Sequence, residues 1–278
     1  MQHRTADDQQ RVGTILSLAI TAALGGFLFG YDTAVINGAV TAIEATFQTS
    51  ASLLGLTVSS ALLGSAAGAL GAGWLADRFG RRPSMVLAAV LFIVSALGSA
   101  LAPRLVDLVV WRVVGGVAVG FASVLAPAYI AEVSPAAMRG RTGSLQQLAI
   151  VLGIFISLLF NYLIVLATSD QEPTSLVGPM AAWRWMLMAE VVPALLYGLL
   201  VLRIPESPRY LVRVGRLDQA RAVIRRTIGE PTQEVMDRIQ ASQIKGRGGS
   251  IRDLFSRRSG LLPIVWTGVL LAIFQQLV

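Results

Sequence analysis

Three ionisable side chains, Asp32, Arg112 and Glu190, lie inside long apolar stretches of this sequence. An ionisable group in the middle of a bilayer-crossing helix costs about 2.5–3.5 kcal/mol, so such groups normally face a partner or a polar cavity. Asp32 and Arg112 carry opposite charges and can neutralise each other. A proton gained or lost by the carboxylate changes that attraction, so the pair could couple proton binding to a change of shape.

Two interpretations of these groups stay open at the level of residue types. The pair Asp32 and Arg112 could be a structural ion pair that fixes two helices, or it could be a proton switch. Glu190 lies three residues before Pro193. It could be a second protonatable site or a hydrogen-bonding group that contacts a neighbouring helix.

Amide side chains form a second class of polar groups within apolar stretches. They are Gln147, Asn161, Gln275 and Gln276. A primary amide offers two donors and an acceptor oxygen, which match the hydroxyl groups of a sugar. An amide in an apolar helix is as often a hydrogen bond between helices. The adjacent pair Gln275–Gln276 favours the binding interpretation, because nothing else in its stretch is similarly polar.

Acidic and basic residues also occur together at the ends of three apolar stretches. They are Asp77, Arg78, Arg81 and Arg82 after the second stretch, Glu132, Arg139 and Arg141 after the fourth, and Glu206 and Arg209 after the sixth. These residues could be solvated charges with incidental acids. Alternatively, they could form an ion-pair network between helices that breaks when this side of the protein opens.

The composition shows which environment positions these residues. Hydrophobic residues make up 54% of the 278 residues and charged residues only 14%, whereas soluble domains carry about 25% charged residues. The chain has no cysteine and one histidine, His3, in a polar leader. No nucleophile–base set, phosphate loop or metal cluster can be assembled, so we expect no enzyme activity, no metal and no cofactor.

Seven stretches are long and apolar enough to cross a bilayer, which takes about 20 residues. The predicted spans are Thr14–Val40, Leu53–Ala76, Ser84–Ala102, Leu105–Ala131, Thr142–Ala167, Ala182–Leu202 and Leu261–Val278. All must be helices, because lipid satisfies no backbone hydrogen-bonding groups. The sequence therefore predicts an all-α membrane protein.

The basic residues orient these spans. Of 23 Lys and Arg, 20 fall in the leader and in every second connection, which places them on one side. Cytoplasmic loops hold such an excess, so we expect a cytoplasmic N-terminus and a multi-pass protein of the cell membrane. The basic balance then needs no nucleic acid as partner. In this arrangement Asp32 and Arg112 both lie about 10–12 Å below the outer surface.

The spans divide the chain into four segments. We expect a cytoplasmic leader (1–13), a six-helix bundle (14–202), a cytoplasmic connection (203–260) and the start of a second bundle (261–278). Within the connection, the patterns of Asp218–Thr227 and Gln233–Gln243 predict short amphipathic helices. The seventh stretch has 18 residues and no polar flank, which indicates a truncated chain that does not transport alone.

Several motifs, in this order and spacing, closely resemble the sugar porter family of the major facilitator superfamily. They are Gly26-Phe27-Leu28-Phe29-Gly30-Tyr31-Asp32, Asp77-Arg78-Phe79-Gly80-Arg81-Arg82, Arg112 before Gly115-Gly116, Tyr129-Ile130-Ala131-Glu132, Pro205-Glu206-Ser207-Pro208-Arg209 and Gln275-Gln276. The run Pro-Glu-Ser-Pro-Arg is the most particular to sugar porters. The chain looks especially similar to bacterial proton-coupled members.

The resemblance implies two six-helix bundles that bind a sugar between them and rock to expose it to either side. It implies that Phe29, Gln147, Gln275 and Gln276 line the sugar site and that Asp32 with Arg112 forms the proton-coupling pair. It also implies a cytoplasmic ion-pair network that includes Arg81, Arg82, Glu132, Arg139 and Arg209. The partners would be a sugar, protons and the bilayer, and a complete site would need the missing second bundle.

One departure leaves the identity of the sugar open. Some proton-coupled relatives have a second glutamine where this chain has Ile154. An uncoupled facilitator is the nearest alternative, although passive members typically have a neutral residue in place of Asp32. A membrane receptor or scaffold that binds sugar without transporting it is the second alternative.

Overall fold

The computed structural model describes residues 6–168 and 172–230, together with a few short pieces between Met236 and Leu270. It divides into two units, residues 1–231 and 232–278. In the second unit, β3 (Phe255–Ser256) pairs antiparallel with β4 (Gly260–Leu261). Of the predicted seventh span only Leu261, Trp266, Thr267 and Leu270 are described, and of the predicted helix Gln233–Gln243 only Met236.

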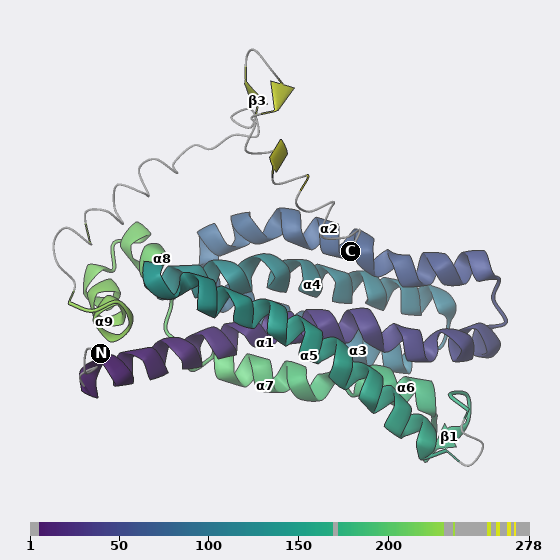
Figure 1. Ribbon diagram of the computed structural model, residues 1–278. Helices are drawn as coiled ribbons and strands as arrows, with labels where there is room; N and C mark the ends of the chain where they lie inside the picture. Colours follow the sequence, from purple (N-terminus) through teal and green to yellow (C-terminus); the bar gives the residue numbers. More distant parts are fainter. Residues whose placement is uncertain are drawn as a thin grey trace. The chain divides into compact units, whose positions relative to one another are not determined.

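The first unit is a bundle of long helices (Figure 1). Its elements are α1 (Ala6–Phe47), α2 (Ala51–Phe79), α3 (Arg81–Leu101), α4 (Leu105–Val133), the 3-10 turn η1 (Ala136–Met138), α5 (Arg139–Leu166), β1 (Leu176–Val177), β2 (Met180–Ala181), α6 (Ala182–Met188), α7 (Val191–Val201), α8 (Pro208–Arg213) and α9 (Leu217–Thr227). Within the described residues, six segments are long and apolar enough to cross a membrane, and they match the first six predicted spans. The amphipathic helix expected at Asp218–Thr227 matches α9.

The sixth span differs from its prediction, because it is two helices instead of one. The break falls at Ala189–Glu190, between α6 and α7. Pro193 has no backbone N–H and cannot bond to the carbonyl of Ala189 four residues earlier. The N–H of Val192 donates to that carbonyl instead, at 3.2 Å, in a tighter turn. The break places Glu190 at the start of α7, with its side chain buried.

The helix α5 shows how the bilayer reverses the usual pattern of an amphipathic helix. Its buried residues are all small or polar: Thr142, Gln146, Gly153, Ser157 and Asn161. Its exposed residues include large apolar side chains such as Phe155 and Phe160. Lipid is as apolar as these side chains, so helices associate through close packing and hydrogen bonds rather than through hydrophobic burial.

Two helix pairs, α2 with α4 and α1 with α5, form the most extensive contacts of the bundle. In the second pair the backbones touch at Gly30 and Gly153. A Cβ atom on Gly30 would lie 2.0 Å from the carbonyl oxygen of Ile150, and one on Gly153 would lie 2.1 Å from that of Phe27. Glycine is therefore required at both positions for the helices to approach this closely.

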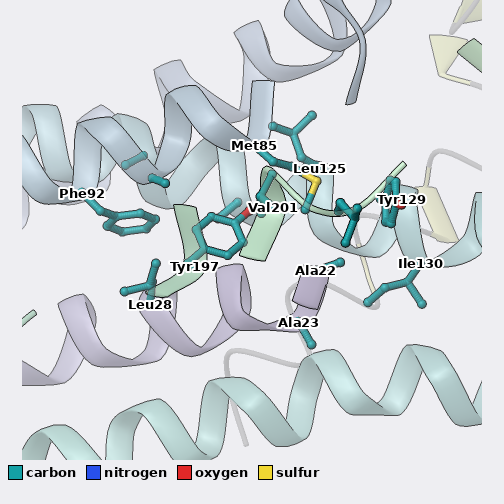
Figure 2. Packing of buried hydrophobic residues seen from close by; sticks show 14 of the residues in the cluster. Ala22, Ala23, Leu28, Met85, Phe92, Leu125, Tyr129, Ile130, Tyr197 and Val201 are labelled. Atoms are coloured by element: carbon teal, nitrogen blue, oxygen red, sulfur yellow. The ribbon is translucent and has the colours of Figure 1, made fainter. Parts of the chain in front are cut away.

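The centre of the bundle is filled by a cluster of buried apolar residues from α1, α3, α4 and α7 (Figure 2). Phe92, Leu125, Tyr197 and Val201 are nearly inaccessible to solvent. This packing fixes α1 and α4, which carry Asp32 and Arg112, against α3 and α7. The polar groups described next are thus held by rigid helices rather than by loops.

Candidate functional site

Asp32 on α1 and Arg112 on α4 form a buried ion pair. The Nη1 of Arg112 donates to Oδ1 of Asp32 at 2.7 Å, and its Nη2 donates to the backbone carbonyl of Asp32 at 3.4 Å. Both side chains are almost fully buried, at 3% and 4% exposed. The contact expected from their shared depth is therefore present, although the coupling role expected for it stays a prediction.

Space for this pair comes from Gly115, one turn after Arg112 on α4. A Cβ atom there would lie 2.4 Å from Oγ of Ser95 and 3.5 Å from Oδ1 of Asp32. The Ser95 hydroxyl itself donates to the carbonyl of Trp111 at 2.7 Å. Helices α1, α3 and α4 thus meet around the carboxylate of Asp32.

Glu190 is the third ionisable group of this cluster. It is 2% exposed and interacts electrostatically with both Asp32 and Arg112. Among the residues that the structure describes, Oε1 of Glu190, Nε of Arg112 and Oη of Tyr31 are buried without a hydrogen-bond partner. Buried polar atoms are normally paired, so these unpaired ones mark the cluster as an unusual part of the core.

The charges of this cluster do not balance when all three groups are ionised. Two carboxylates face one guanidinium, which leaves one negative charge in a low-dielectric interior. An uncompensated buried charge is costly. One bound proton, on either carboxylate, makes the cluster neutral. Loss of that proton leaves a charge that a different helix arrangement could relieve.

The residues expected to line a sugar site are placed less fully. Phe29 is half-buried on α1 and packs against the central apolar cluster, and Gln147 is exposed on α5. Its neighbour Gln146 is buried against α1, where a Cβ on Gly26 would lie 2.5 Å from Nε2 of Gln146. Gln147 follows Gln146 directly, so it lies at about the height of Gly26 along the bundle, close to the level of Phe29. Gln275 and Gln276 lie outside the described residues.

Two other amides on membrane-spanning helices differ in their surroundings: one is buried and the other is exposed. Asn161 acts as a hydrogen bond between helices, because its Nδ2 donates to the carbonyl of Val35 on α1 at 3.1 Å. Asn37, which the sequence analysis did not single out, is exposed on α1 four residues after the exposed Thr33. An amide inside the first long apolar stretch is the sequence signal that could have identified it.

One end of the bundle carries the α2–α3 turn, the end of α4, and α8 and α9; we call it the basic end. Arg81 joins two helices there, with Nη1 3.1 Å from Oδ1 of Asp77 and Nη2 3.2 Å from Oε1 of Glu132. Arg213 on α8 also binds Asp77, at 2.8 Å, and was not expected from the sequence. These bonds connect α2, α3, α4 and α8.

The segment Pro205–Ser207 adds hydrogen bonds to this network, most of them to carboxylate oxygens. The Glu206 carboxylate accepts from the backbone N–H groups of Arg81 at 2.9 Å, Arg82 at 3.2 Å and Ser207 at 2.7 Å. The Ser207 hydroxyl donates to Oε2 of Glu132. The Tyr129 hydroxyl donates to the carbonyl of Pro205 at 2.8 Å.

Three arginines of the expected network make other contacts, and a fourth, Arg209, forms no ion pair within the described residues. The guanidinium of Arg78 lies over the rings of Trp74 and Phe79, Arg82 donates to the carbonyl of Leu202, and Nε of Arg139 donates to the carbonyl of Ser134 at 3.2 Å. Helix C-termini present unpaired carbonyls that arginine can bind. Residue types alone do not reveal whether an arginine binds such a carbonyl or a carboxylate.

The turn between α2 and α3 requires glycine at position 80. The φ of Gly80 is +103°, and a Cβ atom would lie 2.3 Å from Oε2 of Glu206. Only glycine adopts this backbone without strain while leaving room for the carboxylate. The turn and the Glu206 contact therefore depend on each other.

Stability should respond to pH through Glu206. Burial raises the pKa of the Glu206 carboxyl above its ordinary value, although three backbone N–H groups and Arg81 oppose the shift. The folded protein thus binds this proton more readily than the unfolded chain does. The stability from it is full below the unfolded pKa, near 4.5, and is lost as pH rises through the raised pKa. Glu206→Gln should therefore gain stability relative to the unmodified protein as pH rises from acidic to neutral.

Melting temperatures in detergent over this pH range will test the prediction. The exposed Glu44 on α1 provides a matched control, and Glu44→Gln should keep a constant difference from the unmodified protein. A Glu206→Gln difference that stays constant with pH would contradict the linkage.

Comparison with known proteins gives a consistent set of relatives. The family model described as "Sugar (and other) transporter" matches residues 18–278. The glucose transport protein of Synechocystis sp. (strain ATCC 27184 / PCC 6803 / Kazusa) is 54% identical over 264 residues, which cover 95% of this chain and 56% of that protein. The arabinose-proton symporter of Bacillus subtilis is 37% identical, with 96% and 56% covered. The chain thus spans just over half the length of these relatives.

Solved structures give the same picture. The proton:xylose symporter XylE bound to 6-bromo-6-deoxy-D-glucose matches with a TM-score of 0.85 and 36% identity, over 96% of this chain and 60% of that one. The inward open conformation of the xylose transporter XylE from E. coli matches with a TM-score of 0.78, also at 36% identity, over 94% and 61%.

Proposed function

This chain belongs to the sugar (and other) transporter family, and from this premise we propose that the protein moves a monosaccharide across the cell membrane together with protons. The family is one of transporters and not of enzymes. The bundle described above would act together with a second bundle. That second bundle would correspond to the part of the relatives that this chain does not cover. Alternating access would expose a site between the two bundles to either side.

The buried cluster of Asp32, Arg112 and Glu190 is the observation that carries proton coupling. With one proton bound, the cluster is neutral. Deprotonation leaves one excess negative charge, which favours a state in which Arg112 or the carboxylates find other partners. Phe29 and Gln147 would belong to the sugar site on the side of this bundle. The names of the relatives favour glucose, arabinose or xylose as candidates.

The basic end would face the cytoplasm. Of the 23 Lys and Arg, 20 fall on that side of the predicted spans, and an excess of basic residues is retained there. The contacts of Asp77, Arg81, Glu132 and Arg213 would then hold the cytoplasmic ends of the helices together. Opening toward the cytoplasm would require some of these bonds to break.

Uptake by vesicles that contain the complete transporter will test this proposal. We expect radiolabelled glucose, xylose or arabinose to accumulate above the external concentration when the vesicle interior is alkaline, and a protonophore to abolish that accumulation. Equilibration of sugar without accumulation would indicate a facilitator instead. Sugar binding without uptake would indicate a receptor.

A further inference from the structure

A cavity of about 950 Å³ lies at the basic end of the bundle, outside the Asp32 cluster. This open cavity is lined by the first part of α1, the start of α3, the residues that follow α7, and helices α8 and α9. One side is apolar and includes Leu18, Val86 and Leu202. These residues belong to or directly follow membrane-spanning helices, so the cavity lies where the bundle leaves the bilayer.

The polar side of this cavity is strongly basic. Four arginines line it: Arg82, Arg203, Arg216 and Arg226. Its one acidic residue is Glu206, whose carboxylate already accepts three backbone hydrogen bonds. Within residues 6–168 and 172–230, the guanidinium groups of Arg203, Arg216 and Arg226 have neither an ion pair nor a side-chain hydrogen bond.

The helix α9 separates paired from unpaired arginines. Arg221 binds Asp218 at 3.4 Å and Arg225 binds Glu230 at 3.8 Å. At 3.6 residues per turn, Arg221 lies about 140° and Arg225 about 100° around the helix from Arg226. Arg226 lines the cavity together with Arg216, which directly precedes the helix. Acidic partners are therefore present for the arginines of α9 that do not line the cavity, while Arg226 is the one charged residue of α9 among the residues that line it.

We propose that this cavity binds a phosphate group, carried either by an anionic lipid headgroup or by a soluble phosphate compound. Arginine presents a planar fork of N–H donors that matches phosphate oxygens in pairs. Several guanidinium groups around one cavity without an anion repel one another, and a phosphate relieves that repulsion. The bound group would connect the end of α7 to α9 and so stiffen the basic end. This inference does not depend on transport.

The melting temperature of the complete purified protein in detergent will test binding. Three additions are compared: dioctanoyl-phosphatidylglycerol, dioctanoyl-phosphatidylcholine, and inorganic phosphate against sodium chloride of equal ionic strength. A ligand at about ten times its Kd should raise the melting temperature by about 3 °C. A rise with phosphatidylglycerol alone assigns the phosphate to a lipid, and a rise with inorganic phosphate assigns it to a soluble compound. No rise with either would overturn the proposal.

A matched pair of double variants tests the location. Arg216→Gln/Arg226→Gln removes two cavity arginines, and Arg221→Gln/Arg225→Gln removes two from the other face of α9 at the same net charge. The shift should disappear in the first variant and persist in the second. An equal loss in both would mean diffuse charge attraction and would overturn the site. Arg203 is exposed two residues after the end of α7. If the first variant does not fold, Arg203→Gln alone should reduce the shift in melting temperature.

Discussion

Replacing Asp32 with asparagine should abolish sugar accumulation driven by a proton gradient, while exchange of sugar across the membrane continues. Asparagine has the size of aspartate, and its side-chain oxygen can still accept from Nη1 of Arg112, which now lies 2.7 Å from Oδ1. The cluster then contains one guanidinium and the carboxylate of Glu190, so it is neutral without a bound proton. A step that no longer needs a proton cannot be driven by protons.

Two uptake measurements on vesicles with the complete transporter will check this expectation. Accumulation under an imposed pH gradient should fall to simple equilibration, whereas counterflow of labelled against unlabelled sugar should persist. The matched control is Asp107→Asn, which makes the same change on the first turn of α4. It should leave accumulation intact.

The two interpretations of the pair separate in this experiment. A structural ion pair predicts that Asp32→Asn lowers the melting temperature but leaves coupling unchanged. A proton switch predicts lost coupling with a modest effect on stability, because asparagine keeps the contact with Arg112. An Asp32→Asn protein that still concentrates sugar would rule out our proposal for this cluster.

The sequence was sufficient for the first six membrane-spanning segments and for the meeting of Asp32 and Arg112. Lipid permits only helices with internally paired backbones, so long apolar stretches have one solution. An unpaired charged side chain in the membrane interior is costly, so two opposite charges at the same depth are expected to pair. Both inferences rest on large energies, and the structure shows both features.

Finer features could not be predicted because they involve small energy differences or partners without a signal. Gln146 rather than Gln147 is buried because it lies on the stripe of small and polar residues of α5, and a pattern of large apolar residues does not reveal that stripe. Arg82 and Arg139 bind carbonyl oxygens, which every residue supplies. The break before Glu190 needed the effect of Pro193 on a backbone hydrogen bond, which the apolar pattern of the span concealed.

A second large effect is expected from a single methyl group between α2 and α4. A Cβ atom on Gly116 would lie 2.0 Å from the carbonyl oxygen of Ala61, and one on Gly64 would lie 2.2 Å from that of Val113. The obstacle is backbone in both cases, so no side chain can turn away. Gly116→Ala must therefore move α4 from α2, at a cost of about 1–3 kcal/mol for overpacking.

The displacement should reach the charged cluster as well as the melting temperature. Gly116 lies four residues after Arg112 on the same helix, so a shift of α4 moves the guanidinium relative to Asp32. We expect a lower melting temperature in detergent together with weaker coupled uptake. Gly73→Ala makes the same change on α2, where nothing lies within 4 Å of the new atom, and alanine favours a helix over glycine. That control should melt at the same or a slightly higher temperature. If both variants behave alike, the close approach of α2 and α4 does not position Arg112, and the cluster must be held by α1 and α3 instead.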